Sequence, residues 1–184
     1  MAESALRPSR LHHTAYVSRD LEATRKFYED VIGLPLVATW CEIDELFGAQ
    51  RVYCHLFFEL KDGSALAFFQ FANPEDQKLF GPPLAESPFR HIALNVDKET
   101  QDGIERRLAA AGYKEPQTYV LEHGYCRSVY VTDPNDLIVE FTLDREALAL
   151  WDKNMKRVVE PGEFTIYTGA NSVDLKEATL TVAR

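Results

Sequence analysis

One pattern occurs twice in the sequence, and this internal repeat limits the folds that the chain can adopt. In each half, a segment of alternating apolar residues is followed by a helical pattern, a glycine and further alternating segments. His13 and His91 stand 78 positions apart, and Gly33 and Gly112, which end the helical patterns, stand 79 apart. A unit this short cannot cover its own sheet, so the repeat predicts two βαβββ modules that pair.

The pattern predicts an α+β chain with four parts: a first module over 1–72, a proline-rich linker over 73–89, a second module over 90–144 and an extension over 145–184. Four prolines and a glycine between 73 and 88 indicate neither a helix nor a strand in the linker. In the extension we expect a helix over 145–158 and a closing hairpin formed by 163–168 and 178–182.

Composition excludes several classes of function. The 184 residues include 20 basic and 29 acidic side chains, a formal charge of −9, without a run of Lys and Arg, so we expect no nucleic-acid partner. No apolar run is long enough to cross a bilayer and the first residues lack a signal-peptide core, so we expect a cytoplasmic protein with no membrane partner. Three cysteines without a CxxC spacing fit reduced thiols. A chain of this length folds without a structural metal, so any metal is functional.

Polar side chains occupy one face of the strands predicted in the second half. His91 and Asn95 point away from the apolar face of their strand, and Glu140 lies in mid-strand opposite Val139. A carboxylate in mid-strand is costly to bury unless something compensates it. Two imidazoles and one carboxylate suit Fe(II) with open positions, and they also bind Zn(II), Mn(II), Co(II) or Ni(II). If the first strands of the two halves meet, His13 completes this set; the alternatives are a sheet histidine bonded to the backbone and a salt-bridged carboxylate.

Three motifs carry a resemblance to a known family. They are HTAYVSRDL at 13–21 with FYE at 27–29 and IGL at 32–34, FRHIAL at 89–94, and SVYVTDPN at 128–135 running to Glu140 and Phe141. Over residues 11 to 143 the chain resembles the vicinal oxygen chelate superfamily, which includes glyoxalase I, extradiol ring-cleaving dioxygenases and proteins of fosfomycin and bleomycin resistance. The resemblance implies two paired modules that form a curved mixed sheet around a metal site, with the helices on the outer face. The family often pairs modules between chains, so we expect a homodimer.

The resemblance assigns His13, His91 and Glu140 as the metal ligands. His12 is adjacent, but the family spacing to the helix start selects His13, so His12 should face the helices or solvent. Gln70 fills the fourth family position, where glyoxalase I enzymes usually have a glutamate that shuttles a proton. An amide cannot accept and return that proton, so Gln70 disfavours a glyoxalase and is expected to be a weak ligand or a substrate contact.

Extradiol dioxygenases of the family have a tyrosine ten residues before the ligand glutamate, and here that residue is Tyr130. His123 lies near the place of their further histidine. In this assignment Tyr130 hydrogen-bonds a ligating substrate oxygen, His123 acts as acid or base, and Ser128 is a substrate contact. The alternatives are a Tyr130 hydroxyl bonded across the sheet and a solvated His123. The sequence also departs from the larger ring-cleaving enzymes, because it has no histidine at 85–89.

These observations predict a metal-dependent enzyme that acts on a small molecule, with Fe(II) favoured and Mn(II), Zn(II), Ni(II) or Co(II) as alternatives. The first hypothesis is an extradiol-type dioxygenase that cleaves a small aromatic diol. The second is a glyoxalase-like lyase or isomerase, or a fosfomycin-type thiol transferase, with a redox-inert metal. The third is a metal-free module that binds a small molecule.

Overall fold

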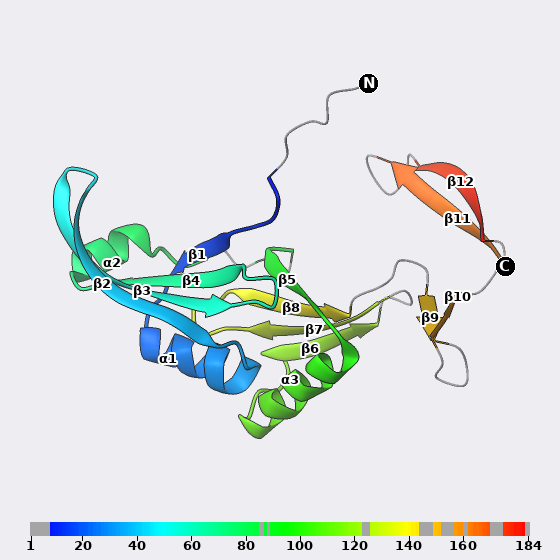
Figure 1. Ribbon diagram of the computed structural model, residues 1–184, viewed down its shortest axis with the longest axis horizontal. Coiled ribbons are helices and arrows are strands. Elements are labelled where there is room, and N and C mark those ends of the chain that lie inside the picture. The colour runs from blue at the N-terminus through cyan, green and yellow to red at the C-terminus, as the bar shows by residue number, and fades with distance from the viewer. Residues whose placement is uncertain are drawn as a thin grey trace.

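Two four-stranded mixed sheets form the body of the protein (Figure 1). The computed structural model describes residues 8–84, 87, 89–122, 126–143, 149–151, 157–159, 162–169 and 175–182. In each sheet the first strand of a module lies at one edge and pairs in parallel with the last strand of that module. The α+β class and the two βαβββ modules predicted from the repeat are confirmed.

Both modules have the same order of elements. The first consists of β1 (His13–Val17), α1 (Leu21–Arg25), its π-helical continuation η1 (Lys26–Ile32), β2 (Leu36–Leu46), β3 (Ala49–Glu59) and β4 (Ala65–Phe71). The second consists of β5 (His91–Val96), α3 (Lys98–Ala110), β6 (Thr118–Glu122), β7 (Arg127–Thr132) and β8 (Ile138–Leu143). The strand orders are β1-β4-β3-β2 and β5-β8-β7-β6, so the two halves share one topology.

Local sequence sets where the module helices begin and end. Asp20 caps α1 by accepting a hydrogen bond from the backbone nitrogen of Glu22 at 2.9 Å, and Asp97 caps α3 through the backbone nitrogen of Thr100 at 2.8 Å. Gly33 ends η1 with a φ of 92°, a left-handed conformation that favours glycine. Each helix therefore follows directly after the first strand of its module, as the repeat predicts.

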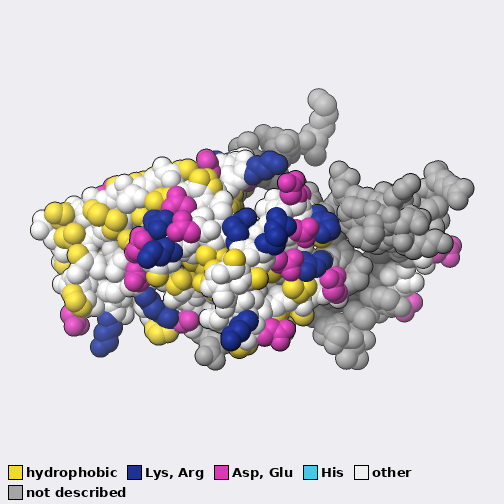
Figure 2. Space-filling view, turned by 90° about the horizontal axis from the view of Figure 1, so that it is seen from below, with side chains coloured by type: hydrophobic (Ala, Val, Ile, Leu, Met, Phe, Trp, Pro, Cys, Tyr) yellow, Lys and Arg dark blue, Asp and Glu magenta, His cyan; other side chains and the backbone are white. Residues whose placement is uncertain are grey.

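A single apolar core joins the modules on the side of the sheets where α1 and α3 lie (Figure 1). Its fully buried members come from both halves and include Phe27, Tyr28, Phe58, Phe68, Ile104, Leu108, Val129 and Phe141. Polar contacts cross the same junction: the Tyr28 hydroxyl donates to Asp133 Oδ2 at 2.9 Å, and Arg107 Nε donates to the Val31 carbonyl at 2.6 Å. The outer surface of these helices carries side chains of both charges (Figure 2). The helix-covered faces of the two modules are thus occupied by contacts within one chain.

The linker contains a helix that its composition does not predict. α2 (Pro74–Phe80) begins after Asn73, whose side chain accepts a hydrogen bond from the backbone nitrogen of Glu75 at 2.8 Å. Proline is tolerated in the first helical turn, because the N–H that it lacks has no partner within the helix there. α2 packs against β4 through Phe80 and Phe71, whose ring centroids are 5.1 Å apart. The expectation that 73–88 holds no helix is therefore wrong.

The extension differs from its prediction in one part and agrees in another. Two of its described segments, β9 (Ala149–Trp151) and β10 (Arg157–Val159), pair as antiparallel strands, so the helix expected over 145–158 is wrong there. The closing hairpin is confirmed, since β11 (Gly162–Gly169) pairs antiparallel with β12 (Leu175–Val182). Within the described parts of the chain, no helix is long and apolar enough to span a membrane.

Candidate metal and substrate site

The strand registers show which residues of the two modules correspond. In the first sheet His13 pairs with the first residue of β4, and in the second sheet His91 pairs with the first residue of β8. Two positions farther along, on the same face of each sheet, lie Ala67 in β4 and Glu140 in β8. Only the second module therefore has a carboxylate beside its first-strand histidine at this position.

The structure brings His91 and Glu140 into direct contact. His91 Nε2 lies 2.9 Å from Glu140 Oε2, across the parallel pair of β5 and β8. The Glu140 residue is only 8% exposed, although it stands in the middle of a strand. A buried carboxylate needs a compensating partner, and here the imidazole supplies one.

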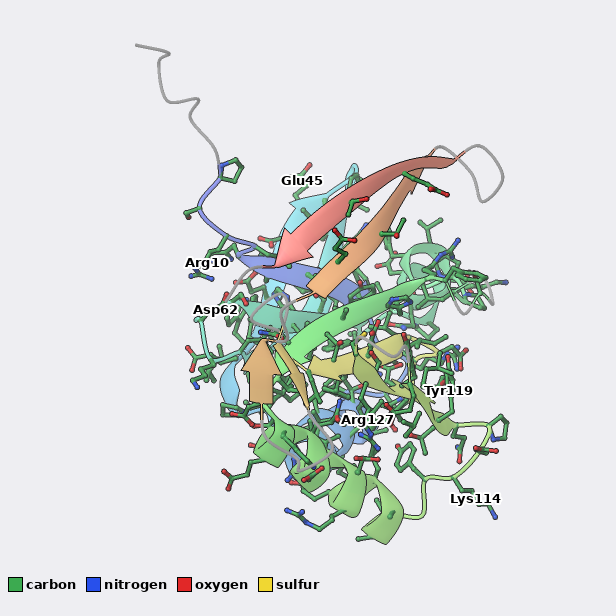
Figure 3. The ribbon with its side chains drawn as sticks, turned by 90° about the vertical axis from the view of Figure 1, so that its right-hand side faces the viewer. Arg10, Glu45, Asp62, Lys114, Tyr119 and Arg127 are labelled. Carbon is green, nitrogen blue, oxygen red and sulfur yellow. The ribbon has the colours of Figure 1, made fainter. Side chains whose placement is uncertain are left out.

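Tyr130 and Ser128 lie on the same face as Glu140, one strand away on β7. Tyr130 is the cross-strand partner of Glu140, and its ring contacts His91 edge to face with centroids 5.7 Å apart. Burial, followed by the negative charge of Glu140 and a hydrogen bond to it, raises the pKa of the Tyr130 hydroxyl. Ser128 is fully buried and its hydroxyl donates to Thr142 Oγ1 at 3.2 Å. The other face of β7 points to α3, as Arg127 shows through its contact with Glu105 at 2.7 Å (Figure 3).

His13 is not part of this cluster within one chain. It is exposed on β1, its Nδ1 lies 2.8 Å from His12 Nδ1, and its ring meets Phe57 edge to face at 5.6 Å. Of the side chains that the structure describes, no three or more of His, Cys, Asp and Glu gather closely enough to hold a metal ion. The structure therefore joins two of the three expected ligands, His91 and Glu140, and leaves His13 on a separate open face.

Gln70 points to the opposite side of its sheet from His13. Its Oε1 accepts a hydrogen bond from the backbone nitrogen of Leu21 at 3.0 Å, and its Nε2 donates to the Arg19 carbonyl at 3.4 Å. These two hydrogen bonds connect the start of α1 to β4. By the strand registers the position equivalent to Glu140 is held by Ala67, three residues before Gln70. The structural counterpart of Glu140 in the first module thus has no polar side chain, and Gln70, predicted for the fourth family position, lies on the other face of the sheet.

The face of the first sheet that carries His13 is aromatic. His55 on β3 stacks on Phe69 with centroids 3.6 Å apart, and Trp40 on β2 stacks on Phe57 at 4.9 Å. His55 is 6% exposed, and its buried Nε2 has no hydrogen-bond partner among the described residues. Burial and, to a smaller extent, the charge of His13 lower the pKa of His55 to about 4, so the ring is neutral at physiological pH. The sequence pattern does not single out His55 for the site, although its place two residues before Phe57 on one strand puts both on one face.

Two carboxylates border this aromatic face. The Tyr53 hydroxyl lies 2.8 Å from Glu42 Oε2 and 2.5 Å from Asp44 Oδ2. Hydrogen bonds to Asp44 and then to Glu42 raise the pKa of Tyr53. Because one hydroxyl carries one proton, it can donate to only one of the two acceptors at a time. The remaining predicted site residue, His123, lies outside the described residues.

Comparison with protein families gives one match over most of the chain. Residues 10–141 match the model of the Glyoxalase/Bleomycin resistance protein/Dioxygenase superfamily. A fibronectin type III-like domain model matches residues 135–172, which is less than half of the chain. No curated protein sequence is similar enough to this chain to count as a relative.

Solved structures with the same fold have low sequence identity to the chain. A glyoxylase/bleomycin resistance protein/dioxygenase domain from Frankia sp. EAN1pec is 19% identical with a TM-score of 0.57, covering 76% of this chain and 95% of that one. The fosfomycin resistance protein FosX from Mesorhizobium loti is 23% identical, with a TM-score of 0.51 and coverage of 76% and 95%. A mutant of FosX from Listeria monocytogenes, in complex with Mn(II) and 1S,2S-dihydroxypropylphosphonic acid, is 20% identical, with a TM-score of 0.54 and coverage of 76% and 96%.

Proposed function

Because the chain belongs to the glyoxalase/bleomycin resistance protein/dioxygenase superfamily, we propose that it is a metal-dependent enzyme whose ligands are His13, His91 and Glu140. The contact between His91 Nε2 and Glu140 Oε2, at 2.9 Å, carries this proposal. Two ligand atoms that each lie about 2.1 Å from one ion, at right angles, are about 3 Å apart. The donor set therefore fits a divalent ion that both side chains share.

The third ligand, in this proposal, comes from a second copy of the chain. The helix-covered faces of both modules are occupied within one chain, whereas on the opposite faces the described residues leave His13 and His91 exposed to a partner. A homodimer that joins these faces brings the partner's His13 to His91 and Glu140. By the two-fold symmetry of such a dimer, each pair of chains has two equivalent sites.

We further propose that the enzyme is an extradiol-type dioxygenase that cleaves a small aromatic diol. Bound Fe(II) would supply open coordination positions for the diol and for O₂. Ala67 favours this assignment, because it leaves the fourth position without a ligand. Tyr130, whose pKa is raised by burial and by Glu140, stays protonated, and in this proposal its one proton is donated to a substrate oxygen instead of to Glu140. Ser128, on the same face two residues before Tyr130, is the proposed substrate contact. His123 is the proposed acid or base.

A second candidate function uses a redox-inert metal. The fold is shared with FosX, and the FosX of Listeria monocytogenes was solved with Mn(II), so a lyase, isomerase or transferase reaction with Mn(II) or another such ion is the alternative. A phosphonate substrate is disfavoured by charge. On the described strands, the site-bearing faces carry one cation, Arg51, and it is paired with Asp76.

Metal reconstitution separates the two candidates. The protein is stripped of metal, loaded anaerobically with Fe(II), Zn(II) or Mn(II), and then tested for O₂ uptake with a panel of catechols. We expect uptake with Fe(II) alone, together with the yellow ring-cleavage product. A complete lack of uptake with every diol would refute the dioxygenase, and a His91→Ala variant that binds the metal as tightly as the wild type would refute the ligand set.

A further inference from the structure

The aromatic face of the first sheet has the features of a ligand subsite. We define this aromatic face by Trp40, His55, Phe57 and Phe69. We propose that His55 determines substrate specificity by hydrogen-bonding a hydroxyl group of a neutral aromatic ligand that packs against the exposed surface of Trp40. The inference rests on the proposed function, because the aromatic face is near the substrate only if His13, on the same side of the sheet, is a metal ligand.

A buried polar atom without a partner is the first observation. The Nε2 atom of His55 is buried, and no described residue hydrogen-bonds to it. Most buried polar atoms in folded proteins are satisfied, so each exception calls for an explanation. A ligand group that reaches Nε2 provides one.

Comparison of the two modules gives the second observation. In the second sheet Ser128 pairs with Thr142, and in the first sheet the equivalent pair is His55 and Phe69. The Ser128 hydroxyl donates a hydrogen bond to Thr142 Oγ1, at 3.2 Å. Phe69 has no side-chain group that could hydrogen-bond to His55, and it contacts His55 only by stacking of the rings. The hydrogen bond that the second module makes internally is therefore left open in the first module.

The rings around His55 are arranged for a flat ligand. Phe69 supports one side of the imidazole at 3.6 Å, and Trp40 meets it edge to face at 5.2 Å. Phe57 stacks on Trp40, with centroids 4.9 Å apart and an angle of 20° between the planes, and so holds the Trp40 ring in place. Trp40 remains 39% exposed, so part of its surface is free to contact a ligand. Offset stacking and edge contacts are the arrangements that aromatic rings prefer.

Charge narrows the class of ligand. Glu42 and Asp44 lie beside the aromatic face and are the hydrogen-bond acceptors for the hydroxyl of Tyr53, the next residue of β3 on that face. Their negative charge repels aromatic carboxylates and phosphates. A hydroxyl group can either donate to a neutral imidazole or accept from it, so it suits both tautomers of His55. The ligand class is thus a neutral phenol or aromatic diol.

Binding to the full-length, metal-free protein tests this role without any turnover. In the presence of EDTA, the affinities of p-cresol and p-xylene, which differ by a hydroxyl in place of a methyl group, are measured by calorimetry and by tryptophan fluorescence. We expect the wild type to prefer p-cresol by about tenfold, since a site built to bond a hydroxyl discriminates against the analogue without it. His55→Phe should reduce the preference to within about twofold while p-xylene still binds, and His55→Gln should retain most of it.

His12→Gln is the matched control, because His12 is an exposed histidine of the same module. Near-ultraviolet circular dichroism establishes that each variant is folded. An unchanged preference in folded His55→Phe, or no binding of p-cresol to the wild type, overturns the proposal. If the protein prefers p-cresol but the reconstituted protein consumes no O₂, the dioxygenase proposal is refuted and the role of His55 is supported. If the reconstituted protein consumes O₂ but shows no preference for p-cresol, the role of His55 is refuted and the dioxygenase proposal is supported.

Discussion

A buried hydrogen bond between Tyr28 and Asp133 is one of the contacts that join the modules, and its removal tests how much it contributes to the junction. The Tyr28 hydroxyl donates to Asp133 Oδ2 at 2.9 Å, and Asp133 is only 4% exposed. A hydrogen bond to a charged group contributes about 1.5–3 kcal/mol. In Tyr28→Phe the carboxylate keeps the backbone nitrogens of Asn135 (2.7 Å) and Leu137 (2.8 Å) as donors, so we place the loss at about 2 kcal/mol.

Urea and thermal denaturation followed by circular dichroism measure this loss. For a chain of this length, about 2 kcal/mol corresponds to a decrease in Tm of about 4–8 °C. Tyr113→Phe is the matched control, since Tyr113 belongs to the same core but takes no part in the hydrogen bonds of Asp133 described above, and it should change the free energy of unfolding by less than about 0.5 kcal/mol. If Tyr28→Phe is no less stable than Tyr113→Phe, this hydrogen bond does not hold the junction.

Three further predictions concern single side chains. Gln70→Ala should lower the free energy of unfolding by about 1 kcal/mol, through loss of the contact with Leu21, and leave metal affinity unchanged in a metal titration. Burial raises the pKa of Asp133, so this carboxyl group stays protonated to higher pH in the folded chain than in the unfolded chain. The stability that its protonation contributes is complete below about pH 4 and is lost as the pH rises through the pKa of the folded state. Urea denaturation from pH 3.5 to 7 should therefore show the wild type losing stability relative to Asp133→Asn as the pH rises. Tyr130→Phe should bind metal normally but reduce kcat for the best diol by about a hundredfold, because a positioned proton donor is gone.

The repeat in the sequence predicts the topology, because matched histidines and glycines mark equivalent points of two modules. It also predicts that His91, Glu140 and Tyr130 share a face, since a period of two residues is enough to assign faces within a strand. It fails at Gln70, because the length of β4 and its pairing with β1 set the register of that strand, and neither is visible in local sequence. The prediction misses α2 for a different reason: the signal of Asn73 followed by proline is a helix start, but the later prolines outweigh it in the composition of the linker. The residues at 145–158 are rich in helix formers, and tertiary pairing of β9 with β10 overrides that propensity.

The separation of His13 from His91 and Glu140 leads to a test of the shared site by complementation. His13→Ala and Glu140→Ala each remove one proposed ligand from every site of the proposed homodimer, so each variant alone should be inactive. When the two are unfolded, mixed in equal amounts and refolded, half of the dimers contain one chain of each kind. In such a mixed dimer one site lacks both ligands, while the other combines the intact His13 of one chain with the intact His91 and Glu140 of its partner. Roughly a quarter of wild-type activity and of tightly bound metal should therefore return on mixing. A site built within one chain cannot be restored in this way, so inactive mixed dimers, with subunit exchange established by a tag on one chain, would show that each chain must complete its own metal site.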